Sequence, residues 1–232
     1  MQRNDGLSTR AIPRRSAAAH APRMTQPIRL YRFPLSGHSH RVELFLSLLS
    51  LPCERIDVDI PKGAHKRPEF LEKNAFGQIP VIEDGDLTLA DSNAILVYLS
   101  LRYDAAGSWY PREPARAGAV QRWLSAAAGP LAFGPGALRV AAVFKKPLER
   151  ERPEQLAAQL LSVMERELGT QPFLVGDHPT IADVALYTYT AHAPEGGVSL
   201  APYPAVRAWI ARFEALPGFI PMVRIPVTAK EA

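Results

Sequence analysis

The chain has 232 residues, which is enough for one large domain or two small ones. Hydrophobic residues make up 47% and charged residues 22%, as in ordinary globular proteins, and no apolar run approaches the roughly 18 residues that a membrane helix needs. The formal net charge of +4 comes entirely from residues 1–23, so the remainder is neutral and lacks the basic surface typical of proteins that bind nucleic acid or anionic membranes.

Two further features of the composition bear on location. Residues 1–23 are rich in Arg, Ala, Ser and Pro without apolar periodicity, so we expect a disordered extension, with Met24 as the natural start. A transit peptide is the alternative. Cys53 is the only cysteine, which excludes an intramolecular disulfide and favours a reducing, cytoplasmic compartment. We interpret Cys53 as a small, partly buried hydrophobic residue.

The first part of the chain has the pattern of a mixed α and β domain. Alternating residues predict strands over Ile28–Phe33 and Arg55–Ile60, with an apolar helical stripe between them, and this unit favours a right-handed parallel strand pair. The run Glu83-Asp84-Gly85-Asp86 between two apolar segments predicts a hairpin. A helix capped by Asp91 or Ser92 follows. The predicted order is therefore β-α-β, a loop, and β-β-α.

Strand patterns stop after residues 104–113, which contain Gly and Pro and are interpreted as a linker. Helical spacing dominates residues 114–232, including an amphipathic stripe from Leu156 to Leu168. A Gly- and Pro-rich segment, Gly129–Gly136, is expected to separate two of these helices. The predicted domains are an extension at 1–23, an α+β domain at 24–103, the linker, and an all-helical domain at 114–232.

The segment Gln78-Ile79-Pro80 stands at the head of an apolar strand. Proline cannot donate to a strand ladder, and we expect the Ile79–Pro80 bond to be cis. The backbone N–H and C=O of Ile79 would then remain free to pair with an extended, peptide-like ligand. The helix that begins near Ser92 offers free N–H groups, which suit a carboxylate.

Five fragments, in matching order and spacing from about Ile28 to Met222, resemble the cytosolic glutathione transferase family. Each fragment is short, and the specificity lies in the combination. The first part of the chain is most similar to the serine-type classes, especially those of plant phi type. The fragments are Ser36…Arg41-Val42; Gly63-Ala64-His65-Lys66 with Pro68-Glu69-Phe70-Leu71; Asn74…Phe76-Gly77-Gln78-Ile79-Pro80; Asp91-Ser92…Ala94-Ile95; and Leu174-Val175-Gly176…Thr180-Ile181-Ala182-Asp183.

The resemblance implies a thioredoxin-like α+β N-terminal domain followed by an all-α C-terminal domain. It also implies glutathione as co-substrate, a small hydrophobic electrophile as second substrate, a cytoplasmic detoxification role and a homodimer. No spacing of His, Cys and acidic residues signals a metal site.

The resemblance assigns catalysis to Ser36, whose hydroxyl would donate a hydrogen bond to the glutathione sulfur. A free thiol has a pKa of about 8.5, and a hydrogen bond to the thiolate lowers that pKa. The structural alternative is a turn or capping serine, although Ser39 is the best candidate for the helix N-cap. His38 and His40 crowd the same turn and are candidate assistants.

The remaining predicted site residues follow the parts of the two substrates. The glycine carboxylate would meet His65 and Lys66, the cysteinyl part Gln78 and the backbone of Ile79, and the γ-glutamyl end Asp91 and Ser92, with Pro80 as a structural cis-proline. The hydrophobic substrate would contact Trp123, Phe133, Leu138 or Phe144, all of which are equally interpretable as core residues.

The function predicted from these residues is transfer of glutathione to a hydrophobic electrophile. Two alternatives stay open at this point: a glutathione-dependent peroxidase, and a protein of the same fold that binds glutathione or a partner without turnover. Serine rather than cysteine at position 36 argues against thiol–disulfide exchange.

Overall fold

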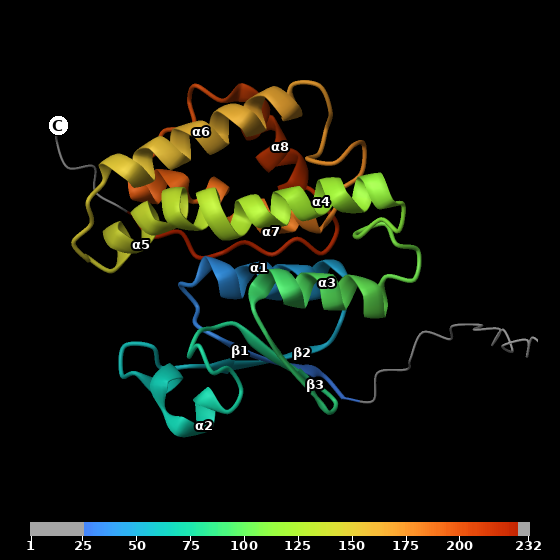
Figure 1. Cartoon of the computed structure of the whole chain (residues 1–232), viewed down its shortest axis with the longest axis vertical. Coiled ribbons are helices and arrows are strands. Elements are labelled where there is room, and N and C mark those ends of the chain that lie inside the picture. Colours follow the sequence, from blue (N-terminus) through green and yellow to red (C-terminus); the bar gives the residue numbers. More distant parts are fainter. Residues whose placement is uncertain (1–25, 227–232) are drawn as a thin grey trace, which may run out of the picture.

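The computed structural model describes residues 26–226, so the extension expected at residues 1–23 lies outside the described residues. Figure 1 shows two stacked parts, a sheet with flanking helices and a bundle of helices above it. We call them the sheet half, residues 26–103, and the helical half, residues 114–226. All strands of the described residues lie in the sheet half, which confirms the predicted thioredoxin-like α+β part followed by an all-α part.

Four strands form one mixed sheet in the order β2-β1-β3-β4. β1 (Ile28–Arg32) runs parallel to β2 (Cys53–Asp57), as the predicted strand–helix–strand unit requires, and antiparallel to β3 (Val81–Asp84). β3 and β4 (Leu87–Ala90) form the predicted hairpin. β2 lies earlier in the chain than the predicted strand, Arg55–Ile60. Its residues pair one for one with those of β1, and the last pair is Arg32 with Asp57.

Helices cover both faces of the sheet. α1 (Gly37–Leu48) and α3 (Ser92–Tyr103) lie between the sheet and the helical half, whereas α2 (Pro68–Leu71) lies on the opposite face (Figure 1). A short helical turn, η1 (Ala64–Lys66), precedes α2. Val42, Phe45 and Leu46 of α1 are buried, as their helical spacing predicts, and Leu48 at its end is partly buried.

One long helical rod, Pro114–Val143, forms the front of the helical half (Figure 1). It consists of α4 (Pro114–Ala126), a π-helical segment η2 (Ala127–Gly136) and α5 (Ala137–Val143). The prediction that Gly129–Gly136 separates two helices is therefore wrong.

Two features of η2 explain why the rod continues. Pro130 and Pro135 lie within it. In an α-helix each proline ring would clash with a carbonyl one turn earlier, but the wider π-type turn moves that carbonyl away. Gly134 brings α6 close, because a Cβ at this position would lie 2.9 Å from the backbone N of Ala157. The Gly and Pro residues thus widen the rod and pack it against its neighbour.

The remaining helices are α6 (Glu151–Leu168), α7 (Ile181–Ala191), a turn η3 (Ala193–Gly196) and α8 (Pro204–Glu214). α7 is buried along its whole length and begins at the capping box formed by Thr180 and Asp183. The rod, at 30 residues, is long and apolar enough to pass for a membrane-spanning helix by length and composition. It packs against α6 and α7, however, as one helix of a bundle does.

The apolar core is continuous across both halves. It runs from Ile28 and Phe45 of the sheet half to Leu186 and Trp209 of the helical half. α7 packs directly against α1. The start of α1 is therefore held by the sheet on one side and by the helical half on the other.

Candidate active site

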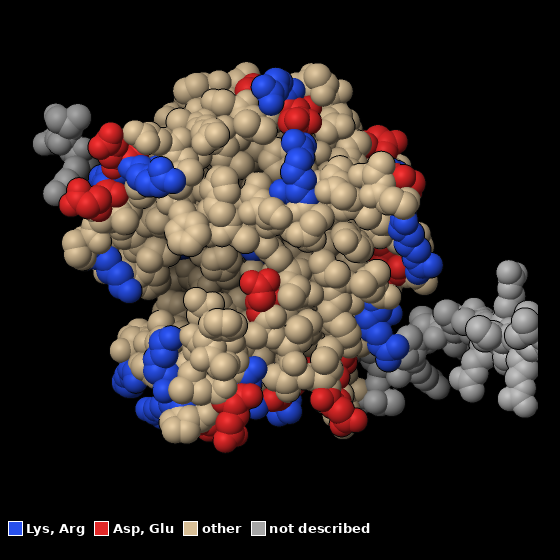
Figure 2. All heavy atoms as spheres, in the orientation of Figure 1, with Lys and Arg blue, Asp and Glu red and all other residues tan. Residues whose placement is uncertain are grey.

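A cavity of about 730 Å³ opens between the two halves. Figure 2 shows the corresponding hollow on the left of the molecule, with Lys and Arg side chains around its outer opening. All seven residues predicted to bind glutathione line this cavity, together with Pro80. They are Ser36, His65, Lys66, Gln78, Ile79, Asp91 and Ser92.

Ser36 caps α1 from inside the cavity. Its Oγ accepts a hydrogen bond from the backbone N–H of Ser39 at 3.2 Å. Ser39, the expected cap, is buried, and its own Oγ accepts from the N–H of Phe33 at 3.2 Å. That expectation is wrong because α1 begins at Gly37, before Ser39. Since the Ser36 hydroxyl only accepts in this contact, its proton remains available to a ligand.

Tyr189 of α7 packs over the start of α1. A Cβ on Gly37 would lie 2.7 Å from the Tyr189 ring, so this close approach requires glycine. Tyr189 is 4% exposed and lines the cavity. Burial raises the pKa of its hydroxyl, against the opposing effect of Arg41 and Arg139. The hydroxyl is therefore protonated at neutral pH.

His38 and His40, the candidate assistants, lie in different surroundings. His38 lines the cavity with Nδ1 3.3 Å from the Ser92 hydroxyl, and burial together with Arg41 lowers its pKa to about 3. His40 lies away from the cavity, where Nε2 donates to the Ile220 carbonyl at 3.0 Å and Nδ1 accepts from the Thr188 hydroxyl at 2.9 Å. Burial lowers the pKa of His40 to about 4. Both rings are neutral at physiological pH.

The segment before β3 presents a free backbone edge to the cavity. The Ile79–Pro80 bond is cis. Neither the N–H nor the C=O of Ile79 is hydrogen-bonded to another of the described residues. Asn74 holds the segment in place, because its side-chain amide donates to the Gln78 carbonyl at 2.8 Å and its Oδ1 accepts from the N–H of Phe76. An extended peptide can pair with Ile79 as a strand would.

The start of α3 carries an acid and a buried hydroxyl. The Asp91 Oδ1 accepts from the N–H groups of Asn93 and Ala94, both at 2.9 Å. Its Oδ2 takes part in no hydrogen bond within residues 26–226, so one carboxylate oxygen is available to a cationic group. Ser92 lies at the first turn, where a helix favours anions.

A buried cation lies beneath this helix start. Arg41 is 1% exposed, and its Nη1 donates to the Ser92 hydroxyl and to Oδ1 of Asn93, both at 2.8 Å. Burial lowers the Arg41 pKa to about 10, so the guanidinium stays charged at neutral pH. It makes no salt bridge with the described acidic residues. Its charge therefore favours an anion in the cavity.

His65 and Lys66 reach the cavity from η1. The Lys66 ammonium donates to the Phe76 carbonyl at 3.1 Å, and burial together with Lys66 lowers the His65 pKa. Gly77 allows this loop to close, because it has φ +56° and a Cβ there would lie 2.7 Å from the His65 carbonyl oxygen. A cation and an imidazole thus line the cavity from η1, whereas Asp91 lines it from the start of α3.

The cavity becomes apolar toward the helical half. Phe33 and Leu35 from the sheet half face Val140 and Phe144 from α5 and its end. The rings of Phe33 and Phe144 lie 6.1 Å apart. Lys146 also lines this end and makes no salt bridge with a described acid.

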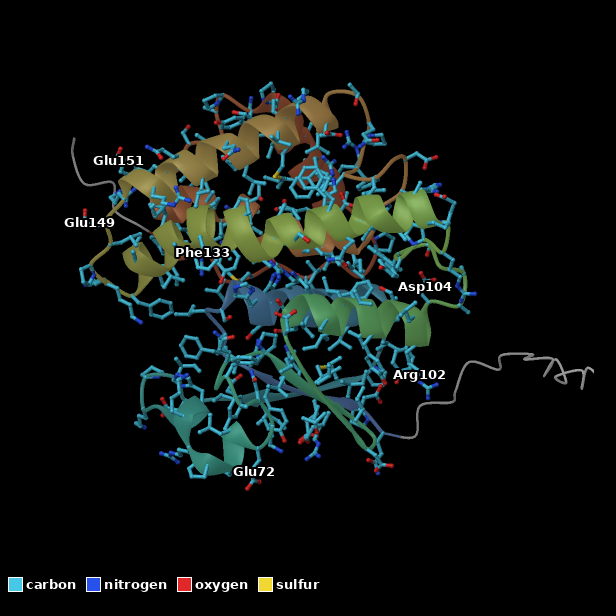
Figure 3. The ribbon with its side chains drawn as sticks, viewed as in Figure 1. Glu72, Arg102, Asp104, Phe133, Glu149 and Glu151 are labelled. Atoms are coloured by element: carbon cyan, nitrogen blue, oxygen red, sulfur yellow. The ribbon has the colours of Figure 1, made fainter. Side chains whose placement is uncertain are left out.

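The four residues predicted to meet a hydrophobic substrate fall into different environments. Phe144 lines the cavity, but Trp123, Phe133 and Leu138 do not. Trp123 is 2% exposed and donates its indole N–H to the Leu174 carbonyl at 3.1 Å, and Leu138 is fully buried in the core. Phe133 lies on the rod (Figure 3), and its side chain is 65% exposed.

Cys53 opens β2 and packs against the core, and burial raises its thiol pKa to about 11. It does not line the cavity. Among the described residues there is no group of three or more His, Cys, Asp or Glu side chains placed to hold a metal ion.

Sequence patterns indicate no role for Tyr189, Arg41 or Arg139, which surround the serine turn. Arg139 carries one recognisable signal, which is a charge on an otherwise apolar helical segment, whereas Arg41 has polar neighbours in the sequence. A charge in that position is buried only when it is hydrogen-bonded. For Tyr189, the contact with Gly37 is visible only in three dimensions.

The fold and the cavity define a two-part protein in which a thioredoxin-like half and a helical half share one ligand site. A family model described as "Glutathione S-transferase, N-terminal domain" matches residues 26–100, and one described as "Glutathione S-transferase, C-terminal domain" matches residues 131–217. The chain therefore belongs to the glutathione S-transferase family.

Individual relatives agree with the family models. The chain is 35% identical to Glutathione S-transferase 3 of Zea mays over 209 residues, in an alignment that covers 83% of this chain and 91% of the relative. A glutathione S-transferase crystal structure from Pseudomonas fluorescens matches with a TM-score of 0.80 and 35% identity, covering 85% of this chain and all of that one. A glutathione transferase homolog from Drosophila mojavensis, with bound glutathione, matches with a TM-score of 0.75 and 28% identity, covering 82% and 89%.

Proposed function

We propose that the chain is a serine-type glutathione transferase in which Ser36 stabilises the glutathione thiolate for attack on a hydrophobic electrophile. The observation that carries this proposal is the content of one cavity. A hydroxyl with a free proton, a free backbone edge and a terminal acid line it together. The curated relative from Zea mays and the glutathione-bound homolog support the same ligand.

Glutathione fits the order of these groups. The γ-glutamyl ammonium pairs with the free oxygen of Asp91, and the neighbouring carboxylate pairs with Ser92 at the start of α3. The cysteinyl backbone pairs with Ile79, whose N–H and C=O are otherwise unused, beside Gln78. The glycine carboxylate then meets the His65 and Lys66 side chains.

Binding in this register directs the thiol toward the start of α1. The Ser36 O–H donates to the sulfur and favours its ionised form, and the N-terminus of α1 adds a favourable field. Each unit of thiol pKa lowering corresponds to about 1.4 kcal/mol. A sulfur electron pair of the thiolate then forms a bond to an electrophilic carbon, while the bond from that carbon to the leaving group breaks and its electron pair departs with the leaving group.

The second substrate occupies the apolar end between Phe33, Leu35, Val140 and Phe144. Aromatic rings and aliphatic side chains there suit a flat apolar electrophile. Trp123, Phe133 and Leu138 have no part in this proposal because they do not line the cavity.

Glutathione-affinity capture followed by a conjugation assay tests the function. We expect capture, turnover of chlorodinitrobenzene, and a loss of about 10²–10³ in kcat/KM for Ser36→Ala, the cost typical of removing one donor to a developing anion. The control is Ser162→Ala, an exposed serine of α6. Capture without turnover on a broad electrophile panel would favour a binding protein, and turnover of organic peroxides alone would favour a peroxidase.

We also propose that the chain forms a cytoplasmic homodimer. Phe76, Leu101 and Phe133 are 80%, 58% and 65% exposed, and large apolar side chains are costly to leave in water. Sedimentation should give a particle of twice the 25.5 kDa chain mass, and a lone 25.5 kDa species at micromolar concentration would contradict the dimer.

A further inference from the structure

A buried arginine of the helical half contacts the backbone beside Ser36. Arg139 lies in α5 with a side chain that is 0% exposed. Its Nη1 donates to the carbonyl oxygen of Leu35 at 2.9 Å, and its Nε donates to Oε2 of Glu195 at 2.7 Å. One guanidinium therefore joins α5, η3 and the serine turn.

Glu195 is itself held from several sides. Its Oε1 accepts from Nδ1 of His192 at 2.6 Å and from the backbone N–H of Ile225 at 3.3 Å. Gly196 lets η3 approach α5, because a Cβ there would lie 2.7 Å from the backbone N of Arg139. The carboxylate that orients Arg139 thus has little freedom to move.

Stability alone does not account for this arrangement. Within residues 26–226 the Nη2 of Arg139 has no hydrogen-bond acceptor, so part of its desolvation is not compensated. Replacing a buried ion pair by apolar side chains of similar volume is often neutral or stabilising. What an apolar side chain could not supply is a donor to the Leu35 carbonyl.

The Leu35 carbonyl belongs to the peptide group that joins Leu35 to Ser36. Fixing its oxygen fixes the plane of that peptide and so restricts the direction of the Ser36 Cα–Cβ bond. Within residues 26–226 the hydrogen bonds of Ser36 itself are local. They run from its N–H to the Phe33 carbonyl, from the N–H of Ser39 to its Oγ and from the N–H of His40 to its carbonyl. Arg139 is the contact that reaches this peptide from the helical half.

We propose that Arg139, oriented by Glu195, is a positioning residue that holds the Leu35–Ser36 peptide so that the Ser36 hydroxyl faces the glutathione sulfur. This inference rests on the proposed role of Ser36. Arg139 acts through the backbone and does not touch the ligand. The helical half thereby contributes to thiol activation as well as to the pocket for the electrophile.

The test measures the thiol of bound glutathione directly, by thiolate absorbance in the ultraviolet as a function of pH. For Arg139→Met we expect the thiol pKa to rise by about one unit, which lowers the thiolate fraction about tenfold below that pKa. The dissociation constant of S-methylglutathione, which has no ionisable thiol, should change less than about twofold, because the groups that bind the peptide stay in place.

Three further variants separate positioning from folding. Arg139→Met with Glu195→Gln removes both buried charges and should give the same thiol shift without leaving an unpaired carboxylate. Arg139→Lys should give a partial shift, since one ammonium cannot reproduce the planar fork. The matched control is Arg150→Met, because Arg150 donates to the Gly196 carbonyl at 3.0 Å in the same region without reaching the serine turn.

Each outcome bears on one claim. An unchanged thiol pKa in the double variant, or an equal shift in Arg150→Met, overturns the positioning role of Arg139. Should Arg139→Met fail to fold, the double variant and Arg139→Lys decide. Absence of a depressed thiol pKa in the unmodified enzyme would instead overturn the proposed function of Ser36, so the two failures are distinguishable.

Discussion

The sheet half lines the cavity with polar groups that lie close together in the sequence, between residues 36 and 92, whereas the helical half lines it with Val140, Phe144, Lys146 and Tyr189. We call these surfaces the sheet wall and the helical wall. The sheet wall presents groups matched to a thiol peptide. The helical wall is largely apolar, and behind it lie Arg139 and Glu195.

This difference indicates a division of labour. The sheet wall recognises the ligand through unused hydrogen-bonding groups, while the helical wall shapes the apolar end and supports the serine turn from outside. The two walls meet where Tyr189 packs on Gly37 and where Arg139 contacts Leu35. Substitutions on one wall should therefore alter different measurements from substitutions on the other.

The largest effect is expected where the walls touch. Gly37→Ala places a Cβ 2.7 Å from the Tyr189 ring, so α1 or α7 must shift. Overpacking of this kind destabilises by about 1–3 kcal/mol, to be measured by urea denaturation together with activity. The control is Gly118→Ala in α4, where a Cβ meets nothing within 4 Å and should stabilise slightly. Equal stability of the two variants would show that the Tyr189 ring moves aside for a Cβ at position 37 without a cost in stability.

A smaller effect, confined to recognition, is expected for Asp91→Asn. The asparagine keeps an oxygen to cap α3 but loses the charge for the ligand ammonium. We expect KM for glutathione to rise about tenfold at nearly constant kcat, as for the loss of one charge-assisted hydrogen bond. Asp86→Asn, in the exposed hairpin turn, is the control. A fall in kcat without a rise in KM would place Asp91 in the chemistry instead.

The pH dependence of stability tests the burial of His40, which joins α1 to Thr188 and Ile220 of the helical half. Burial lowers the pKa of His40 from 6.5 to about 4, so between these values the unfolded chain binds a proton that the folded chain does not. The free energy of unfolding should therefore fall as the pH decreases through this window, with His40 contributing up to about 1.4 kcal/mol per pH unit.

Urea denaturation across this window measures that contribution. His40→Asn should have a shallower slope than the unmodified protein, whereas His178→Asn, at an exposed position, should not. Parallel slopes in all three proteins would mean that His40 is protonated in the folded state.

The smallest effect is expected at the open end of the helical wall. Lys146 lines the apolar end without an acidic partner among the described residues, so it should favour an anionic electrophile. Lys146→Gln should raise KM for chlorodinitrobenzoate about two- to fivefold, the range of an exposed ion pair, and leave neutral chlorodinitrobenzene unaffected. Lys145→Gln is the control, and an equal response of both electrophiles would exclude a charge effect.

The same division explains what could be predicted from the sequence. Ile79-Pro80, Asp91-Ser92 and Thr180…Asp183 are local patterns whose geometry follows from neighbouring residues, and the structure forms the cis bond and both caps there. The continuous rod does not follow from the sequence, because Pro130 and Pro135 ordinarily break a helix. The π-helical segment η2 forms where the chain packs closely against α6.

Contacts between distant segments account for the rest. By sequence, both Ser36 and Ser39 could be the N-cap of α1. Which of them caps the helix depends on the residue at which α1 begins after β1. Arg139 lies 104 residues from Leu35, so no local pattern links them. Trp123 and Phe133 are side chains typical of a hydrophobic pocket. Whether each one faces the cavity, the core or solvent depends on how the rod packs against its neighbouring helices.

The most direct test of the central claim is the ultraviolet titration of the glutathione thiol bound to the unmodified protein and to Ser36→Ala. We predict a bound-thiol pKa at least about one unit below the free value of roughly 8.5, and a return toward that value in Ser36→Ala while glutathione stays bound. An equally low thiol pKa in both proteins would contradict it and move thiolate stabilisation to another group of the cavity.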